Sequence, residues 1–395
     1  MPAPFDAAVY RKRLELVYAR MGQRGIHALY LPPSGDLEYL TGFRRRKAAH
    51  TDLVQPADWM FGALITPYAG VYVLAPYMVT SYAIAQAADK AWINDVVRVP
   101  EHGDPMAFLA ALPRRFGLGD LHGITLAVGN RIAAETVFAL NTAFPGLSVV
   151  AAGDLVSQLR QIKQPDELAL MRHAAAIADR AFEAVLGKLK PGITDLDVAT
   201  EVDYQLQVHG AEWTSFPTGI VFSGKTDPRN AEESREVGPP ARRRLEPGMH
   251  IAFDFGAVYQ GYCSDFGRTV FCGEPSAEER QIHTLVMTAQ AAGMAEMRSG
   301  LSTGQSADKA ARDVLAAAGY AEHFWHRLGH GIGCDVHEPP FLTAAEQRTL
   351  HSGMTFTVEP SVLKQGVAIR VEDVVLVTPS GGECLNHASH DLIII

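Results

Sequence analysis

The second half of this chain contains two copies of one pattern, and this repeat limits its fold more than any other feature. In each copy a Gly-hydrophobe-Ser/Thr turn opens a helix, first in KPGITDLDVATEV and again in RSGLSTGQSADKA, where Ser302 to Gln305 fits a capping box. A Gly-Met pair then opens a strand, in PGMHIAFDFG and in SGMTFTVEPS, and an acid follows six residues after the glycine, Asp254 or Glu359. The repeat predicts two related α+β halves that face each other and place acids in a common centre.

The composition is that of an ordinary globular protein. The chain has 395 residues, 47% of them hydrophobic and 20% charged, which is enough for a large core and for two domains. The net charge of -9 argues against nucleic acid or an anionic membrane as the main partner. No run reaches the roughly 18 apolar residues of a membrane-spanning helix, and the start of the chain has no secretory-signal pattern. Because the four cysteines form no CxxC pair, we expect a reduced, cytoplasmic protein.

Residues 1–158 alternate helix-like and strand-like segments. An amphipathic helix at 8–23 leads to the apolar strand HALYLP, a hairpin joins WMFGALITP to GVYVLAP, and GITLAVG and LSVVAAG are further strands. These segments predict a small α/β domain, in which we find no dense cluster of His, Asp and Glu. A break at Pro165 precedes a long alanine-rich helix, so we place the boundary near 155–165 and a second domain at 159–395.

Four acids of the second domain lie in segments whose neighbours are apolar. Asp254 and Asp265 belong to IAFDFGAVYQGYCSDFGRTVF, which alternates, turns at Tyr259 to Gly261 and alternates again, as a β-hairpin does. Glu359 ends the strand in GMTFTVEPS, and Glu372 lies within the strand VAIRVEDVVLV. Since a buried carboxylate is costly unless it is paired or bound to a metal, each of these acids needs a partner.

Each acid also has a simpler structural interpretation. Asp254 or Asp265 could cap a turn or pair with Arg268. Glu372 could pair with Arg370, which lies two positions earlier and therefore shares its strand face. For any one acid taken by itself, these alternatives stay open.

The segment HRLGHGIGCDVHEPP, residues 326–340, contains three histidines separated by glycines. Because glycine is entropically costly, the backbone here must bend unusually or approach another group closely. Four buried acids and one histidine would form an oxygen-rich site for two divalent cations, with a water between them that becomes a hydroxide nucleophile. His330, between two glycines, is the best candidate for the imidazole ligand. His326 and His337 would then serve the substrate as proton donors or hydrogen-bond partners.

The order of these motifs resembles that of the pita-bread metallopeptidases of family M24. Asp254 and Asp265 are followed by GHGIG, VEP and RVED, as in aminopeptidase P, prolidase and methionine aminopeptidase. YLTGF at 39–43 and LRQIKQPDELALMRHA at 159–174 are similar to segments of the proline-specific branch, whereas methionine aminopeptidases usually lack the N-terminal domain. The resemblance implies an α/β creatinase-like N-terminal domain and an α+β pita-bread catalytic domain with an internal pseudo-twofold repeat.

The resemblance also implies a role for each matching residue. The five metal ligands of the family match Asp254, Asp265, His330, Glu359 and Glu372. Glu359 would in addition act as general base toward the water between the metals. His326 and His337 match two active-site histidines that are not ligands, and Arg370 matches an arginine that contacts substrate. We expect two manganese ions, with zinc or cobalt as alternatives, and a homodimer.

The implied activity is metal-dependent hydrolysis of the peptide bond that precedes proline, by an Xaa-Pro dipeptidase (prolidase). Aminopeptidase P and an ectoine hydrolase-like amidohydrolase are the alternatives, because one fold hosts several reactions. One departure keeps them open: the family usually has a further histidine about 17 residues before the first metal aspartate, where this chain has Val237. A carboxypeptidase-like variant and a lyase also stay open, although the lyase would need an acid in place of Ala252. Creatinase-type enzymes and a non-catalytic binding module fit the intact ligand set less well.

Overall fold

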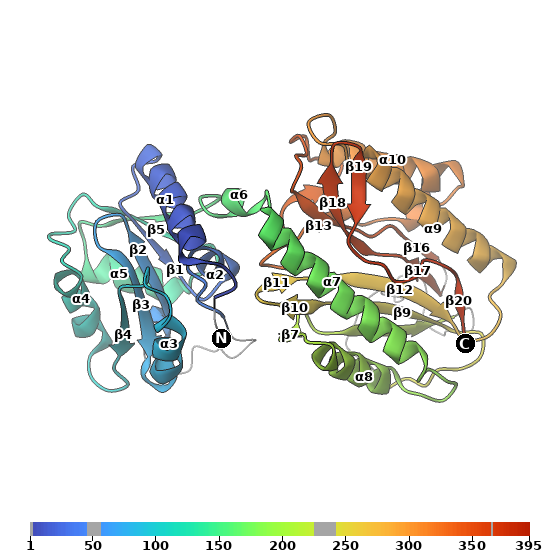
Figure 1. Cartoon of the computed structure of the whole chain (residues 1–395), viewed down its shortest axis with the longest axis horizontal. Coiled ribbons are helices and arrows are strands. Elements are labelled where there is room, and N and C mark those ends of the chain that lie inside the picture. The colour runs from blue at the N-terminus through green and yellow to red at the C-terminus, as the bar shows by residue number, and fades with distance from the viewer. Residues whose placement is uncertain (1–2, 46–56, 225–241, 365) are drawn as a thin grey trace. The chain divides into compact units, whose positions relative to one another are not determined.

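A computed structural model of the chain describes residues 3–45, 57–224, 242–364 and 366–395 (Figure 1). The chain divides into two compact units, Met1–Arg160 and Gln161–Ile395, and each is described separately below. The segment around Val237, where the family histidine is missing, lies outside the described residues, so the prediction made for it stays a prediction.

The first unit is built on a mixed sheet with the strand order β4-β3-β2-β1-β5-β6. Its strands are β1 (Ala28–Leu31), β2 (Gly62–Thr66), β3 (Gly70–Pro76), β4 (Asp95–Val99), β5 (Thr125–Val128) and β6 (Ser148–Ala151). Its helices are α1 (Ala7–Gln23), α2 (Gly35–Thr41), α3 (Thr80–Ala87), α4 (Pro105–Arg115), α5 (Ala134–Ala143) and α6 (Ser157–Arg160), with short 3-10 turns η1 (Asp58–Met60) and η2 (Tyr77–Val79). One sheet face packs on α4 and α5 through apolar side chains such as Tyr30, Leu112 and Leu140. The predicted hairpin is the antiparallel pair β2 and β3.

The second unit contains two helix pairs and the remaining strands. The helices are α7 (Pro165–Leu186), α8 (Asp195–Val208), α9 (Ala277–Glu296) and α10 (Gly304–Ala317), with a 3-10 turn η3 (Ala321–His323). The strands of its first half are β7 (Trp213–Thr214), β8 (Gly219–Ser223), β9 (His250–Phe255), β10 (Ala257–Tyr259), β11 (Tyr262–Cys263) and β12 (Phe266–Phe271). The later strands are β13 (Gly329–Gly331), β14 (Glu338–Leu342), β15 (Thr355–Val358), β16 (Ser361–Lys364), β17 (Val367–Arg370), β18 (Asp373–Thr378), β19 (Gly381–Cys384) and β20 (Ile393–Ile394).

Each half of the second unit packs its own helix pair against its own sheet (Figure 1). Helices α7 and α8 share a core with β8, β9 and β12, to which Phe182 and Phe253 contribute edge to face. Helices α9 and α10 share a second core with β15 and β18, to which Val286 and Phe356 belong. The C-terminal segment DLIII ends as β20, which pairs in parallel with β12 and so closes the edge of the first sheet.

The turns that open the second helix of each pair match in type but differ by one residue in position. Thr194 caps α8, and its hydroxyl and the Asp197 carboxylate bond reciprocally to backbone N–H groups. In the other half the cap is Thr303, which exchanges the same bonds with Ser306. The capping box predicted at Ser302 is therefore wrong by one residue. The Ser302 hydroxyl accepts a bond from the backbone N–H of Arg298 instead, 3.3 Å away.

The Gly-Met pairs adopt the same backbone conformation in both halves. Gly248 has φ of 87° and Gly353 has φ of 90°, in the left-handed region that a side chain disfavours. A strand follows each glycine directly, β9 in one half and β15 in the other. The two acids six residues later, Asp254 and Glu359, therefore reach matching places at the ends of these strands.

The segment predicted as one strand, VAIRVEDVVLV, is divided in the structure. Strand β17 ends at Arg370 and pairs with β16, whereas β18 begins at Asp373 and pairs with β15. Between them, Glu372 exchanges two backbone hydrogen bonds with Gly267 of the first half, of 3.2 and 2.9 Å. The strand is interrupted here because the chain changes its partner strand. The interruption places Glu372 at the junction of the two halves.

Two further observations concern the cysteines and the helices. All four cysteines, Cys263, Cys272, Cys334 and Cys384, are free thiols. Among the residues that the structure describes, no helix has the length and the apolar character needed to cross a bilayer.

Candidate metal centre

The four acids come from equivalent places in the two halves. Asp254 lies near the end of β9 and Asp265 directly precedes its antiparallel neighbour β12. Glu359 directly follows β15 and Glu372 directly precedes its neighbour β18. Since antiparallel neighbours bring the end of one strand beside the start of the next, each half presents two carboxylates at one edge.

The side chains of the five predicted ligands converge. The Nε2 atom of His330 lies 3.4 Å from Oδ2 of Asp265 and 3.6 Å from Oε1 of Glu359. Donor atoms of Asp265, His330 and Glu372 all lie within 4.8 Å of one another. Asp254 joins them through Arg370, whose Nη2 is 2.9 Å from Oδ2 of Asp254 and whose Nε is 3.4 Å from Oε2 of Glu372.

Burial of so many like charges shifts their proton affinities. Desolvation raises the pKa of Asp254 to about 6, with Asp265 adding to the rise and the Arg370 guanidinium opposing it. Desolvation, followed by the charge of Asp265, raises the pKa of Glu372 well above its usual value. Burial lowers the pKa of His330, but the carboxylates of Asp265 and Glu359 outweigh it and the net shift is upward. Divalent cations would stabilise the charged carboxylates, which burial and mutual repulsion disfavour.

The imidazole of His330 is oriented as a metal ligand. Its Nδ1 lies 3.0 Å from the carbonyl oxygen of Gly331, and because a carbonyl only accepts, this nitrogen carries the proton. In the neutral ring, the lone pair of Nε2 therefore points toward Asp265 and Glu359. A ring nitrogen fixed by the backbone, with the other left for the ion, is the usual arrangement of a histidine ligand.

The glycines beside His330 are explained by close packing of the backbone. A Cβ on Gly329 would lie 1.9 Å from the carbonyl oxygen of Thr357, and one on Gly331 would lie 2.5 Å from the carbonyl oxygen of Glu338. Strand β13 pairs with both β14 and β15 here, so positions 329 and 331 have no space for a side chain. The close approach inferred from the sequence is the correct reason for these glycines.

The residues present fit a pair of divalent cations. Oδ1 of Asp265 is buried and has no hydrogen-bond partner among the described residues. Carboxylate oxygens with one imidazole nitrogen form a hard to borderline donor set, which suits divalent first-row metals. Gly267 leaves the necessary space, since a Cβ there would lie 2.8 Å from Oε2 of Glu372.

Of the two charge pairs considered as simpler explanations for the acids, the described residues contain only the one between Arg370 and Glu372. Arg268, considered as a partner of Asp254 or Asp265, pairs instead with Asp373 at 2.7 Å. Arg370 does pair with Glu372, but also with Asp254, so one guanidinium serves two of the four carboxylates. Arg370 is only 5% exposed and its guanidinium lies against these acids.

The two further histidines lie differently. His337 is exposed, and its ring centroid is 4.2 Å from that of His330. His326 is half-buried, with Nε2 2.7 Å from the hydroxyl of Ser361 and Nδ1 2.7 Å from the carbonyl oxygen of Arg327. The structure therefore brings His337 to the ligand cluster and holds His326 against β16.

Two features of the site were not predicted. Thr357 accepts a hydrogen bond from the backbone N–H of His330 and donates one to Oε1 of Glu359, both of 3.1 Å. Thr357 lies two residues before Glu359 and therefore on the same strand face, so strand periodicity could have predicted this contact. Lys163 forms a buried ion pair of 3.4 Å with Glu338, the residue after His337. No spacing rule could have found this pair, because 175 positions separate its members.

Two similar halves with four acids and a histidine between them define the pita-bread class of metal-dependent hydrolases. Residues 169–379 match the profile of metallopeptidase family M24, and residues 13–162 match the Creatinase/Prolidase N-terminal domain. The chain therefore belongs to metallopeptidase family M24, and it is a hydrolase. Membership implies divalent metal ions and a peptide substrate. The predicted fold, a creatinase-like domain followed by a pita-bread catalytic domain, is confirmed.

Relatives and solved structures resemble the chain over nearly its whole length. The probable dipeptidase PepE of Mycobacterium tuberculosis is 33% identical, over 99% of this chain and 98% of that protein. The prolidase from Thermococcus sibiricus superposes with a TM-score of 0.86 at 27% identity, over 98% of this chain and 99% of that one. The X-Pro aminopeptidase from Thermotoga maritima gives a TM-score of 0.80 at 25% identity, over 97% and 99%.

Proposed function

We propose that this protein is an Xaa-Pro dipeptidase that works with two divalent metal ions. The observation that carries the proposal is the convergence of Asp265, His330 and Glu372 within 4.8 Å, with Asp254 and Glu359 beside them. Similarity to a prolidase and to a probable dipeptidase supports the substrate class. We propose manganese as the metal, with zinc or cobalt as alternatives, because four carboxylates outnumber one imidazole in the donor set.

Divalent ions at such a site polarise a carbonyl oxygen and lower the pKa of a bound water. In our proposal Glu359 accepts the proton of the attacking water as general base, and it would also hold a metal ion as ligand. Its side chain is 13% exposed, the most of the five proposed ligands, and Thr357 donates a hydrogen bond of 3.1 Å to its Oε1. A partly exposed carboxylate with a fixed orientation suits proton transfer from water.

The other side chains bind and orient the substrate. We assign His337 to the oxyanion or to the leaving nitrogen, because it is exposed and its ring lies beside that of His330. His326, held by Ser361, contributes to the wall of the substrate site. Arg370 acts as a positioning residue through Asp254 and Glu372, which its guanidinium joins. A direct contact between Arg370 and substrate, as the family resemblance implies, remains part of the proposal.

A panel of three peptides tests the proposed substrate. We expect the manganese-loaded protein to hydrolyse Ala-Pro and to leave Ala-Pro-Ala and Ala-Ala intact, with products identified by mass. The tertiary amide before proline has no N–H, so selection must use the shape of the ring and the peptide termini. Release of Ala from Ala-Pro-Ala would favour the alternative activity, that of an aminopeptidase P. The X-Pro aminopeptidase from Thermotoga maritima, which this chain resembles in structure, supports keeping that alternative. Release of Ala-Pro would indicate a carboxypeptidase, and no cleavage at all would point to an ectoine hydrolase-like amidohydrolase.

The substitution His337→Ala tests the assignment of the exposed histidine. We expect turnover of Ala-Pro to fall by about 100-fold or more, the lower range for removal of a catalytic acid or base. The unfolding temperature should change little, since an exposed side chain contributes little to stability. Steady-state kinetics and thermal unfolding, measured on the same preparations, separate the two effects. A variant that loses stability but keeps wild-type turnover would make His337 a structural residue.

We also propose a cytoplasmic homodimer without a nucleic-acid or membrane partner. The net charge of -9 argues against a nucleic-acid or anionic-membrane partner, and the four free thiols favour the cytoplasm. Light scattering tests the dimer, because a monomer would give the mass of a single chain, 42.8 kDa.

A further inference from the structure

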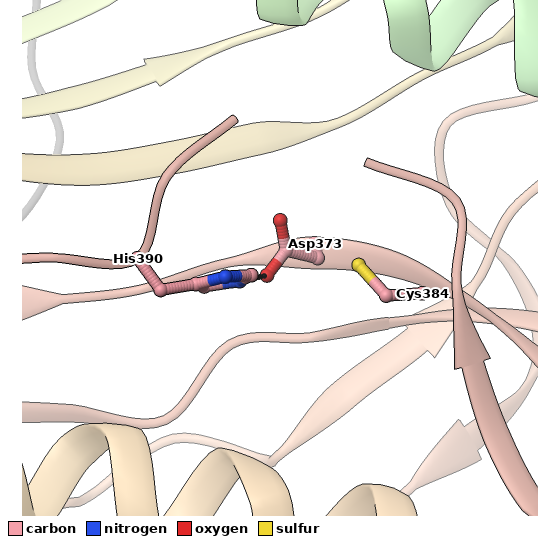
Figure 2. Close-up of side chains that lie close together, drawn as sticks. All are labelled: Asp373, Cys384 and His390. Carbon is pink, nitrogen blue, oxygen red and sulfur yellow. Dashed lines mark hydrogen bonds and ion pairs between the residues drawn. The ribbon is translucent and has the colours of Figure 1, made fainter. Parts of the chain in front are cut away.

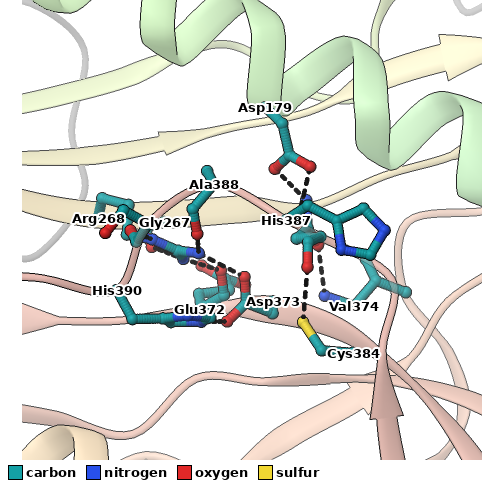
Figure 3. A network of polar contacts seen from close by, with 12 residues as sticks. Asp179, Gly267, Arg268, Glu372, Asp373, Val374, Cys384, His387, Ala388 and His390 are labelled. Carbon is teal, nitrogen blue, oxygen red and sulfur yellow. Dashed lines mark hydrogen bonds and ion pairs between the residues drawn. The ribbon is translucent and has the colours of Figure 1, made fainter.

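Asp373, the residue after the proposed ligand Glu372, is the centre of a buried polar cluster that the proposed chemistry does not use (Figure 3). Its side chain is fully buried. Oδ1 accepts a hydrogen bond of 2.7 Å from Arg268. Oδ2 lies 2.8 Å from Nε2 of Gln290 and 2.7 Å from Nε2 of His390. We refer to these four residues, Asp373, Arg268, Gln290 and His390, as the Asp373 cluster.

Arg268 connects the cluster to the backbone of Glu372. Its Nη1 donates to the carbonyl oxygens of Gly267 and Glu372, both at 2.8 Å. Its Nη2 binds Asp373, and its remaining N–H groups bind carbonyl oxygens of residues 388–389, at 3.1 and 3.2 Å. All five donors of the guanidinium are therefore used. One buried side chain fixes Glu372, strand β12 and the C-terminal segment together.

Gln290, on α9, connects the cluster to the other ligand of the same half. Its Nε2 donates to Oδ2 of Asp373 and, at 3.1 Å, to the carbonyl oxygen of Val358. Val358 immediately precedes Glu359, just as Asp373 immediately follows Glu372. The two residues are also opposite each other in β15 and β18. A single amide group thus holds the chain beside both proposed ligands.

Two members of the cluster, together with the neighbouring Cys384, have the composition of a metal site. Donor atoms of Asp373, Cys384 and His390 lie within 4.8 Å of one another (Figure 2). Both oxygens of Asp373 already accept hydrogen bonds, however, and the positive guanidinium of Arg268 is 2.7 Å away. Burial, followed by the charge of Asp373, raises the pKa of the Cys384 thiol to about 12, and the thiol lies 3.2 Å from the carbonyl oxygen of Asn386. A neutral thiol and a fully bonded carboxylate favour structural support over metal binding.

We propose that the Asp373 cluster positions the ligands Glu359 and Glu372, and that His390 contributes this function from the C-terminal segment. The inference rests on the proposed metal centre. Hydrogen bonds one step beyond the ligands fix carboxylate orientation, and their loss typically costs about 10- to 100-fold in metal affinity or activity. The cluster is well suited to this role because it contacts the backbone next to two ligands at once.

The first test removes the amide of Gln290 and measures Mn²⁺ binding to the metal-free protein by calorimetry. We expect Gln290→Met, which keeps the length of the side chain, to weaken Mn²⁺ binding by about 10- to 100-fold. Gln86→Met is the matched control. Gln86 is 1% exposed and exchanges bonds of 2.7 and 2.8 Å with the backbone of Arg44 in the first unit. Both variants should unfold at lower temperature, and only Gln290→Met should lose metal affinity.

The second test uses His390, whose side chain is 34% exposed and should tolerate substitution without loss of the fold. His390→Leu removes the donor to Asp373, whereas His390→Gln can keep an N–H in a similar place. We expect the leucine variant to bind Mn²⁺ more weakly and the glutamine variant to regain most of the affinity. A role in folding alone would lower the unfolding temperature of the leucine variant and leave its Mn²⁺ affinity unchanged. If Gln290→Met fails to fold, this pair decides the question.

Three results would overturn the inference and one concerns the metal centre itself. Wild-type affinity in a folded Gln290→Met, or equal affinity of the two His390 variants, would make the cluster merely structural. Loss of one bound metal per chain in Cys384→Ala would make it a metal site, whereas we expect that variant to bind as wild type does. Failure of the wild-type protein to bind Mn²⁺, Zn²⁺ or Co²⁺ would instead reject the proposed function, so the two failures are distinguishable.

Discussion

Asp265→Asn and His330→Ala are each expected to lose bound metal and peptidase activity together. Oδ2 of Asp265 lies 3.4 Å from Nε2 of His330 in the proposed metal centre. Its buried Oδ1 has no hydrogen-bond partner among the described residues. Asparagine replaces one of these oxygens with an NH₂ group and removes the charge, and alanine removes the imidazole entirely. Loss of a residue that hydrogen-bonds to a ligand costs up to about 100-fold in metal affinity. We expect the loss of a ligand itself to cost more.

Metal content by mass spectrometry and hydrolysis of Ala-Pro, on the same samples, check this prediction. The metal-free Asp265→Asn protein should unfold no earlier than metal-free wild type, because the substitution removes a charge from a crowded, buried site. Asp313→Asn is the control, since Asp313 is 62% exposed and pairs with Lys309, four residues earlier on the surface of α10. Stoichiometric metal in either ligand variant would show that the ligand set is wrong.

Glu359→Gln is expected to abolish turnover while the protein stays folded. The substitution keeps the length of the side chain, and an amide oxygen can still accept the 3.1 Å hydrogen bond from Thr357. It removes the base, so we expect turnover of Ala-Pro to fall by about 100- to 10,000-fold, the usual range for general-base catalysis. Because Glu359 is also a proposed ligand, metal content must be measured beside the rate.

The outcome of this substitution separates two roles of one carboxylate. Loss of turnover with metal retained would assign Glu359 mainly to proton transfer, and loss of both would assign it mainly to metal binding. Glu383→Gln serves as control, because Glu383 is 49% exposed and pairs with Arg172 at the surface of the same unit. A rate near that of wild type in Glu359→Gln would contradict both roles.

Local signals in the sequence were sufficient to predict the first pair of acids. The hairpin of Asp254 and Asp265 depends on a tight turn, in which Gln260 and Gly261 have φ of 46° and 86°. Such turns have strong residue preferences, and alternation of apolar side chains fixes the register. The same reasoning erred by one residue at Thr303, because Ser302 and Thr303 are both good caps and the Ser302 hydroxyl instead accepts a bond from the backbone N–H of Arg298, four residues earlier.

The second pair of acids shows where local signals end. The sequence predicts Glu372 within a continuous strand, but the chain changes partners between Arg370 and Asp373. Valine and isoleucine on both sides favour a strand equally well, so nothing local marks the break. The partner of Glu372 at this point, Gly267, lies in the other half of the repeat.

The sequence by itself determined the repeat, the four acids and the histidine between glycines, because burial, turn formation and close backbone packing each restrict the residue types that a position accepts. Apart from the pair of Arg370 and Glu372, which lie two positions apart, only the tertiary structure decided which charges pair. Arg268 pairs with Asp373, Arg370 pairs with two of the proposed ligands at once, and His390 and Gln290 bind the same carboxylate. These partners come from separate helices, strands and the C-terminal segment. Electrostatic pairing depends on distance in space, and the spacing of residues along the chain does not contain that distance.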